Sequence, residues 1–241
     1  MADIKDERGF NQIFEDTPAA RIRKERRCDY MIKQMDRSPL NSTTNILEIG
    51  CGTGEAIQYI ADKTGANCLG VDLSEKFIQN ANQLYKTENL LFEVADFNNQ
   101  DSFKGDMAYG KFDYVVGNGI LHHLYYNLDN TLINLNKLLR NGGKIIFIEP
   151  NIYNPYVALI FKVPYFRKKA YLEPDEMAFS GNFIKRKLMA ANFSTCNIEI
   201  KDFLLPNVPE KFINPVIKIG SVLEKTPVTL IAQSIFITAD K

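Results

Sequence analysis

The chain has 241 residues, of which 45% are hydrophobic and 24% charged, so it is long enough for one large globular domain and too apolar to be disordered. Its 29 lysines and arginines are balanced by 29 acidic residues, which argues against a general nucleic-acid binder. The four cysteines form no Cys-x-x-Cys pair, so we expect reduced thiols and no metal site. No stretch approaches about 18 apolar residues, so we expect a cytoplasmic protein with no signal peptide and no transmembrane segment.

Residues 1–43 are predicted to form an N-terminal helical cap, with a helix over residues 18–35. This helix carries five cations, Arg21, Arg23, Lys24, Arg26 and Arg27. The run resembles a phosphate site, but a solvated helix face is the interpretation we favour, because charge runs on helices usually face water.

Residues 44–150 alternate between strand and helix patterns and form the expected cofactor-binding core. Strands are predicted at 46–49, 67–71, 90–94, 112–116 and 144–148, and helices at 55–63, after the capping residue Ser74, and at 127–139. The run Asn141-Gly142-Gly143 is predicted to end the last helix. Such an alternation predicts a parallel sheet with helices on both faces.

Residues 151–180 form a segment that mixes aromatic side chains with Lys162, Arg167, Lys168 and Lys169. Residues 181–241 form a C-terminal helix and strands with an apolar insertion at 204–225. Strands at 196–200 and 230–238 suit an antiparallel pair at one sheet edge. The apolar insertion suits dimerisation or contact with a membrane surface.

Three glycines, Gly50, Gly52 and Gly54, follow the first predicted strand and precede a helix. Glycine allows positive φ and close approach of the backbone to a ligand, and the helix start adds free N–H groups and a positive dipole end. A dinucleotide site needs Gly-x-Gly-x-x-Gly, but here the third glycine comes one residue early and Glu55 would repel a pyrophosphate. The turn favours a cofactor with an ammonium and a sulfonium instead.

Acidic residues stand at the ends of the first three predicted strands: Glu48, Asp72 and Asp96. Ligands of open α/β sheets bind at these ends, and an acid after the second strand is placed to accept hydrogen bonds from ribose hydroxyls. Asp96 and the adjacent Phe97 stand where a purine would lie. Each acid alone could be a loop residue or a helix cap, but three at successive strand ends favour a nucleoside site.

With these features, the chain resembles the class I S-adenosylmethionine-dependent methyltransferases. The matching segments are Leu47-Glu48-Ile49-Gly50-Cys51-Gly52-Thr53-Gly54, Val71-Asp72-Leu73-Ser74, Ala95-Asp96-Phe97, Phe112-Asp113-Tyr114-Val115-Val116, Leu121-His122-His123-Leu124 and Leu138-Leu139-Arg140-Asn141-Gly142-Gly143. The resemblance implies a Rossmann-like α/β fold in a single domain, with a seven-stranded, mostly parallel sheet whose last strand is antiparallel. It also implies that residues 151–180, which follow the fifth strand, form the substrate lid, and the apolar insertion at 204–225 suits completion of this lid. The residues of the lid suit either an acceptor with an acidic group or a lid that packs on its own core.

The resemblance also implies roles for residues in binding S-adenosylmethionine. Glu48 and the glycine turn would hold the methionine moiety, Asp72 the ribose and Asp96 the adenine, and residues 117–119 would line the pocket near the methyl group. The expected cofactor-binding residues are Glu48, Gly50, Cys51, Gly52, Gly54, Asp72, Leu73, Asp96, Phe97, Gly117 and Asn118.

His122 and His123, the only histidines, follow the fourth predicted strand, and Glu149 ends the fifth. Methyl transfer to a hydroxyl gains from a base tuned near neutral pH, so we predict that at least one histidine is catalytic, with Glu149 orienting it; the alternative is that they only pack or cap. The Asn/Asp-Pro-Pro-aromatic motif of nucleobase and glutamine N-methyltransferases is absent after strand four, and Asn154-Pro155-Tyr156 is interpreted as a turn.

The sequence therefore predicts methylation of a small molecule, hydrophobic or amphipathic, at oxygen rather than at nitrogen or carbon. Two alternatives are methylation of a lipid-linked or sugar intermediate at the membrane face, and a non-catalytic cofactor-binding partner protein. A homodimer and peripheral membrane contact are both compatible with the sequence.

Overall fold

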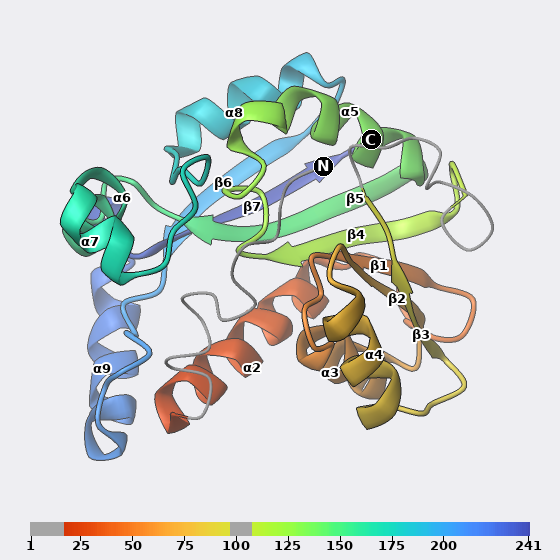
Figure 1. The fold of residues 1–241 in the computed structure, drawn as a ribbon, viewed down its shortest axis with the longest axis horizontal. Helices are drawn as coiled ribbons and strands as arrows, with labels where there is room; N and C mark the ends of the chain where they lie inside the picture. Colours follow the sequence, from red (N-terminus) through yellow and green to blue (C-terminus); the bar gives the residue numbers. More distant parts are fainter. Residues whose placement is uncertain (1–16, 97–107) are drawn as a thin grey trace.

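The structure, a computed structural model, describes residues 17–96 and 108–241 and is built around one seven-stranded sheet (Figure 1). The strand order is β3-β2-β1-β4-β5-β7-β6. Only β7 runs antiparallel to its neighbours, so the predicted fold class is confirmed. The strands are β1 (Asn45–Ile49), β2 (Asn67–Asp72), β3 (Leu90–Val94), β4 (Phe112–Asn118), β5 (Leu139–Pro150), β6 (Cys196–Lys201) and β7 (Ser234–Asp240).

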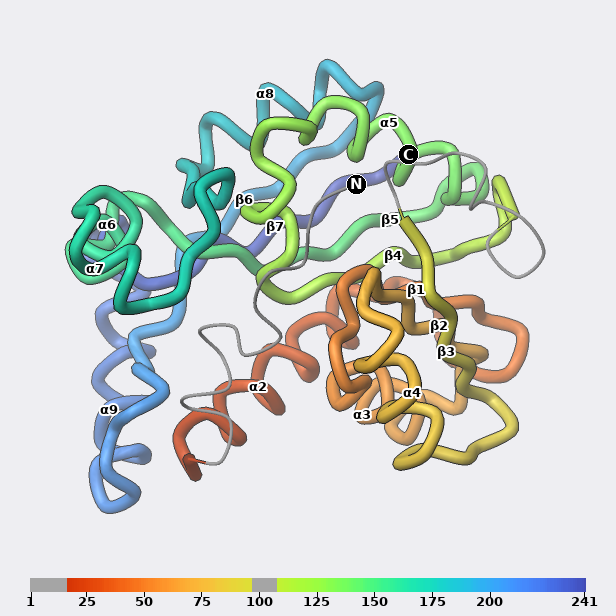
Figure 2. Tube along the Cα trace, in the orientation of Figure 1, coloured from red at the N-terminus to blue at the C-terminus, as the bar shows by residue number. Residues whose placement is uncertain are grey.

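Helices cover both faces of the sheet, as the tube in Figure 2 makes plain. The helices α2 (Pro18–Gln34), α3 (Glu55–Thr64) and α4 (Glu75–Leu84) lie on one face, and α5 (Leu128–Leu138) and α8 (Gly181–Ala190) on the other. Because side chains alternate along a strand, Ile46 of β1 packs with the first group, whereas Leu47 and Ile49 pack with the second. Strands buried on both faces explain the nearly continuous apolar runs in the sequence.

The boundary between α5 and β5 differs from the prediction. The helix ends at Leu138, and β5 already begins at Leu139, so Asn141-Gly142-Gly143 lies inside the strand rather than ending the helix. Gly142 has φ of 72°, and the pairing with β4 shifts register between Phe112 and Tyr114. The glycines therefore form an irregular start to the strand, a role that glycine also favours.

Two segments with short helices lie at the end of the sheet toward which β5 points (Figure 1). The first segment contains α6 (Pro155–Lys162) and α7 (Pro164–Lys169). The second contains α9 (Glu210–Leu223) and the 3-10 turn η4 (Pro227–Ile231). Another 3-10 turn, η3 (Tyr125–Asn127), lies elsewhere in the chain and precedes α5. Asn154 caps α6, so Asn154-Pro155-Tyr156 starts a helix and is not a simple turn. Across the described ranges, no helix is both long enough and apolar enough to span a bilayer. The division into cap, core, lid and C-terminal part remains a prediction.

Candidate functional site

The glycine turn after β1 combines close packing with one open position. Gly50, Gly52 and Gly54 have φ of 63°, 54° and 87°. A Cβ on Gly54 would lie 2.5 Å from the ring of Phe92, and one on Gly50 would lie 2.5 Å from the side chain of Ile120. A Cβ on Gly52 would meet nothing within 4 Å. The outer glycines thus let other elements approach, and the middle glycine faces open space where a ligand can come close.

Asp72 joins the glycine turn to the loop after β2. Its Oδ2 accepts a hydrogen bond of 2.9 Å from the N–H of Gly52, and its Oδ1 one of 2.9 Å from the N–H of Ser74. The carbonyl of Asp72 also accepts from the N–H of Ala95 at 3.1 Å, which brings Asp96 to the neighbouring strand end. Leu73 lies in the same loop, whereas Phe97 lies outside the described residues. Asp72 therefore shapes the site as well as standing where a ribose is expected.

Glu48 is a buried acid with an unused oxygen. It is only 2% exposed, and its Oε2 has no hydrogen-bond partner among the residues that the structure describes. Burial, with a contribution from the charge of Asp72, raises the pKa of Glu48 to about 8. A buried carboxylate without a cation is costly, so this side chain fits a ligand that brings a positive charge.

A cavity of about 190 Å³ lies over Glu48 and the glycine turn. It is lined by Gly50, Cys51 and Gly52 from the turn, by Asn118 at the end of β4, and by residues of α2. These groups fit the amino-acid end of S-adenosylmethionine, because Glu48 offers a counter-charge for the ammonium and Gly52 leaves room for the chain.

Two arginines of α2 point inward and were not predicted to do so. Arg27 Nη1 donates to Asn118 Oδ1 at 2.8 Å, and both Arg27 Nη2 and Arg23 Nε donate to Asp202 Oδ2, at 3.1 and 2.8 Å. The interpretation of the basic run as a solvated face is therefore wrong for these two residues, although Arg21 and Arg26 are exposed. The spacing of four between positions 23 and 27 places them on one side of the helix, and that signal could have separated them from their neighbours.

Burial and electrostatics tune this pair. Burial, together with the neighbouring charge of Arg23, lowers the pKa of Arg27 to about 10, against the opposing charge of Asp202. Burial works against the charged form of Asp202, but the two arginines outweigh it and lower the pKa of that carboxyl group. The cluster connects α2 to the end of β4 and to the segment after β6, so it holds in place the residues of α2 that line the cavity.

His122 and Glu149 form a buried pair at the carboxyl ends of β4 and β5. His122 Nδ1 lies 2.9 Å from Glu149 Oε2. The same carboxylate accepts N–H bonds from Ile120 and Leu121 at 2.9 and 2.8 Å through Oε1, and from His122 at 3.3 Å through Oε2. Burial and the neighbouring His123 lower the pKa of His122, although Glu149 opposes this shift. The imidazole is thus oriented through Nδ1 and favours the neutral form, which can accept a proton at Nε2.

His123 has a different environment. Its side chain is 42% exposed, and its Nδ1 lies 3.1 Å from Glu176 Oε1. Burial disfavours the charged imidazole, but the hydrogen bond and charge of Glu176 outweigh it and raise the pKa of His123. Nitrogen and oxygen atoms of His122, His123 and Glu176 lie within 4.8 Å of one another, a grouping that the sequence did not predict. Each histidine already has a carboxylate partner.

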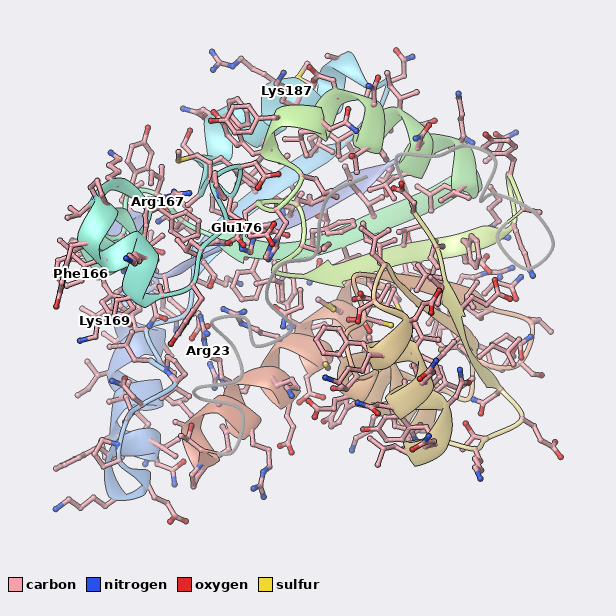
Figure 3. The ribbon with its side chains drawn as sticks, in the orientation of Figure 1. Arg23, Phe166, Arg167, Lys169, Glu176 and Lys187 are labelled. Atoms are coloured by element: carbon pink, nitrogen blue, oxygen red, sulfur yellow. The ribbon has the colours of Figure 1, made fainter. Side chains whose placement is uncertain are left out.

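The segment after β5 closes over this pair. The ring of Phe161 meets the ring of His122 edge-on with centroids 5.7 Å apart, and the N–H of Met177 donates to the His122 carbonyl at 3.0 Å. Arg167 donates to the carbonyls of Phe161, Glu173, Pro174 and Glu176, so it stabilises the segment internally. In Figure 3, Glu176 lies inward over the sheet, whereas Lys169 and Phe166 lie at the outer edge. Arg167 therefore stabilises the fold of this segment.

The sequence of the chain is similar to known methyltransferase domains. Residues 47–145 match the family described as "Methyltransferase domain". The hybrid PKS-NRPS synthetase thnA of Trichoderma harzianum is 32% identical over 117 residues, which is 46% of this chain and 3% of that protein. The matched segment is thus a small part of a far longer relative.

Solved structures with the same fold are also methyltransferases. A SAM-dependent methyltransferase from Archaeoglobus fulgidus has a TM-score of 0.65 at 19% identity and covers 96% of this chain and 98% of its own. The Haemonchus contortus phosphoethanolamine N-methyltransferase 2, in complex with S-adenosyl-L-methionine, has a TM-score of 0.65 at 15% identity. The match covers 90% of this chain and 52% of that chain. The CurJ carbon methyltransferase has a TM-score of 0.64 at 21% identity, and the match covers 95% of this chain and 57% of that chain. These likenesses show that the chain shares the fold of these proteins.

Proposed function

Because this chain is a class I S-adenosylmethionine-dependent methyltransferase with S-adenosylmethionine as its cofactor, we propose that it methylates a small-molecule acceptor whose nucleophilic atom must first lose a proton. The observation that carries this proposal is the 2.9 Å contact between His122 Nδ1 and Glu149 Oε2 in a buried site. Such a pair is suited to general-base catalysis, because the carboxylate fixes the imidazole and stabilises the charge that it gains.

The cofactor supplies an electrophilic methyl group on a sulfonium. The protein aligns the acceptor with this group and excludes water, which are the main requirements of an in-line displacement. His122 Nε2 takes the acceptor proton as the acceptor atom bonds to the methyl carbon, and the electrons of the breaking carbon–sulfur bond pass to sulfur. Glu48, Asp72 and Asp96 bind the cofactor in this proposal, together with Gly50, Cys51, Gly52, Gly54, Leu73, Gly117 and Asn118 along the strand ends.

Two acceptor atoms need such a base. A hydroxyl oxygen is the first, and it is the atom that the sequence favours. A carbon made acidic by a neighbouring carbonyl is the second, and it is supported by the similarity to polyketide synthases and to the CurJ carbon methyltransferase. A lipid-linked or sugar intermediate is compatible with either atom. An amine with a free lone pair needs no base in this position, so it is the acceptor that the pair supports least.

His122→Ala should lower kcat by about 10²–10⁴ with cofactor affinity unchanged, because a positioned base contributes this much. The measurement uses methyl-labelled S-adenosylmethionine with a phenol and an acetoacetyl thioester as probes, and mass spectrometry separates O-methyl from C-methyl products. Since burial lowers the pKa of His122, the base stays neutral as the pH falls through the ordinary histidine pKa of about 6.5. The acidic limb of kcat/KM should therefore lie below that pH and disappear in the variant.

His123→Ala provides the matched control, since that side chain is exposed and pairs with Glu176 instead. Full activity of His122→Ala would remove the base from the proposal. Calorimetry without detectable S-adenosylmethionine binding would overturn the cofactor site itself.

A further inference from the structure

The outer face of α9 carries an apolar stripe. Phe212, Pro215, Ile219 and Val222 recur at helical spacing and are all exposed. The opposite face of the same helix is also apolar, and there Ile213 packs with Ala19 and Leu204. The helix is therefore apolar on two sides, and within the described residues only one of them is covered.

The segment with α6 and α7 lies next to α9. Asn154, the cap of α6, donates through Nδ2 to the carbonyl of Ile231 in η4 at 2.6 Å, and η4 packs on α9. Figures 1 and 2 place α6 and α7 directly above α9 at the same end of the sheet. We call this region the α6–α9 surface; its main exposed apolar side chains are Leu159, Tyr165, Phe212, Ile219, Val222 and Leu230.

The same segments also carry exposed lysines. The exposed lysines of the α6–α9 surface are Lys162, Lys168, Lys169, Lys211, Lys218 and Lys225. Three of them recur every seven residues along α9 and beyond its end, so they form a row beside the stripe. None of the six forms an ion pair with a described acid, and Lys211 lies 5.0 Å from the ring centroid of Phe212. Cations beside aromatic and aliphatic side chains are the pattern of a helix that lies in a membrane interface.

We propose that the α6–α9 surface binds the headgroup region of an anionic lipid bilayer. The lysines complement the negative surface potential, and the apolar side chains enter the boundary between headgroups and acyl chains. A second copy of this chain fits less well, because a symmetric contact through the surface would set the lysine rows against each other.

Helix α6 connects the α6–α9 surface with His122, the proposed base. The exposed Leu159 and the buried Phe161 belong to the same helix α6, and Phe161 contacts His122. A bilayer at this surface would lie against the lid that covers the pair of His122 and Glu149. This step rests on the proposed function, and it assigns the acceptor to amphiphiles that reside in the membrane, whose reactive headgroup enters beneath the lid.

Co-sedimentation with vesicles tests the surface directly. The probes are vesicles of phosphatidylcholine alone and vesicles with about 30% phosphatidylglycerol, each at low and high salt. We expect wild-type protein to bind the anionic vesicles at least about tenfold more tightly and to lose this preference at high salt. The double variants Ile219→Glu/Val222→Glu and Lys211→Glu/Lys218→Glu should each weaken binding by about tenfold or more.

Met189→Glu is the matched control, because Met189 on α8 is as exposed as Ile219, at 60%, but lies outside the surface. Circular dichroism and S-adenosylmethionine affinity check that all variants fold. Equal binding of the wild-type protein to both vesicles, or equal binding by Met189→Glu and Ile219→Glu/Val222→Glu, would overturn the proposal. The proposal would also be overturned if light scattering showed a dimer that the Ile219→Glu/Val222→Glu variant dissociates. Vesicle binding does not depend on His122, so this failure is distinguishable from failure of the proposed function.

Discussion

The two ends of the site are held together by different kinds of contact. At the proposed cofactor end, neighbouring strand ends are joined through the backbone, as when Asp72 after β2 accepts the N–H groups of Gly52 and Ser74. At the proposed acceptor end, around His122, one buried carboxylate joins separate segments: Glu149 accepts three backbone N–H bonds and pairs with the His122 ring, and the N–H of Met177 donates to the His122 carbonyl.

This difference predicts how each end responds to mutation. The cofactor end is a preformed turn in which a side chain added to a glycine has an immediate steric effect. The acceptor end depends on buried polar groups that several segments share, so loss of one group affects both the fold and the position of His122. Single substitutions at each end should therefore have separable effects on stability, cofactor affinity and turnover.

The largest effect is expected from Gly54→Ala. The new Cβ would lie 2.5 Å from the buried ring of Phe92, in a residue with φ of 87°. Overpacking and the left-handed backbone together should destabilise the protein by about 3 kcal/mol. Urea denaturation measures this loss, which should appear with or without the cofactor.

Gly52→Ala is the matched change at the cofactor end. Its Cβ would meet nothing within 4 Å, so only the backbone cost of about 1 kcal/mol applies. The methyl group instead enters the space beside the cavity, and S-adenosylmethionine affinity should fall by tenfold or more in calorimetry. Equal stability losses at the two positions, with cofactor binding intact in Gly52→Ala, would contradict the assignment of the open position.

Glu149→Gln tests the acceptor end. An amide cannot accept all four bonds that this carboxylate receives, so at least one buried donor loses its partner, which should cost about 2 kcal/mol. The imidazole of His122 loses its orienting charge, and kcat should fall by about 100-fold with little change in cofactor affinity. Glu176→Gln is the comparison, because Glu176 pairs with a half-exposed histidine, and its stability should change by less than about 1 kcal/mol. A similar loss in both variants would contradict the difference between the two pairs.

The turn with its three glycines could be predicted from the sequence, because it is a local pattern between a strand and a helix. The spacing of Gly50, Gly52 and Gly54 and the acids at strand ends follow directly from chain order. Asp72 shows the limit of this reasoning, since nothing in the sequence revealed that its oxygens hold two turns. The proposed roles of these residues in binding and catalysis remain predictions.

The cluster of Arg23, Arg27 and Asp202 was harder to predict, because its members are far apart in the chain. Arg23 and Arg27 looked like part of a solvated run, and only the fold brings Asp202, 175 positions after Arg27, next to them. The apolar insertion contains α9, whose internal Pro215 obscured the helix in the sequence. The end of α5 was misplaced because glycines serve strand irregularities as well as helix ends.

The smallest effect is expected from Arg167→Met. This change removes the donor to four lid carbonyls at residues 161, 173, 174 and 176. Three of these bonds are only partly buried and the one to Pro174 is exposed, so water can replace part of the bonding, and we expect a loss of only about 1 kcal/mol, or roughly 2–4 °C in Tm. The lid should open more often, and trypsin should cleave after Lys168 and Lys169 about fivefold faster, while S-adenosylmethionine affinity stays unchanged. Arg186→Met, at an exposed position of α8, should leave the cleavage rate as in wild type. If Arg167→Met weakened cofactor binding as strongly as Gly52→Ala, the two ends of the site would be coupled, and the separation drawn between them would not hold.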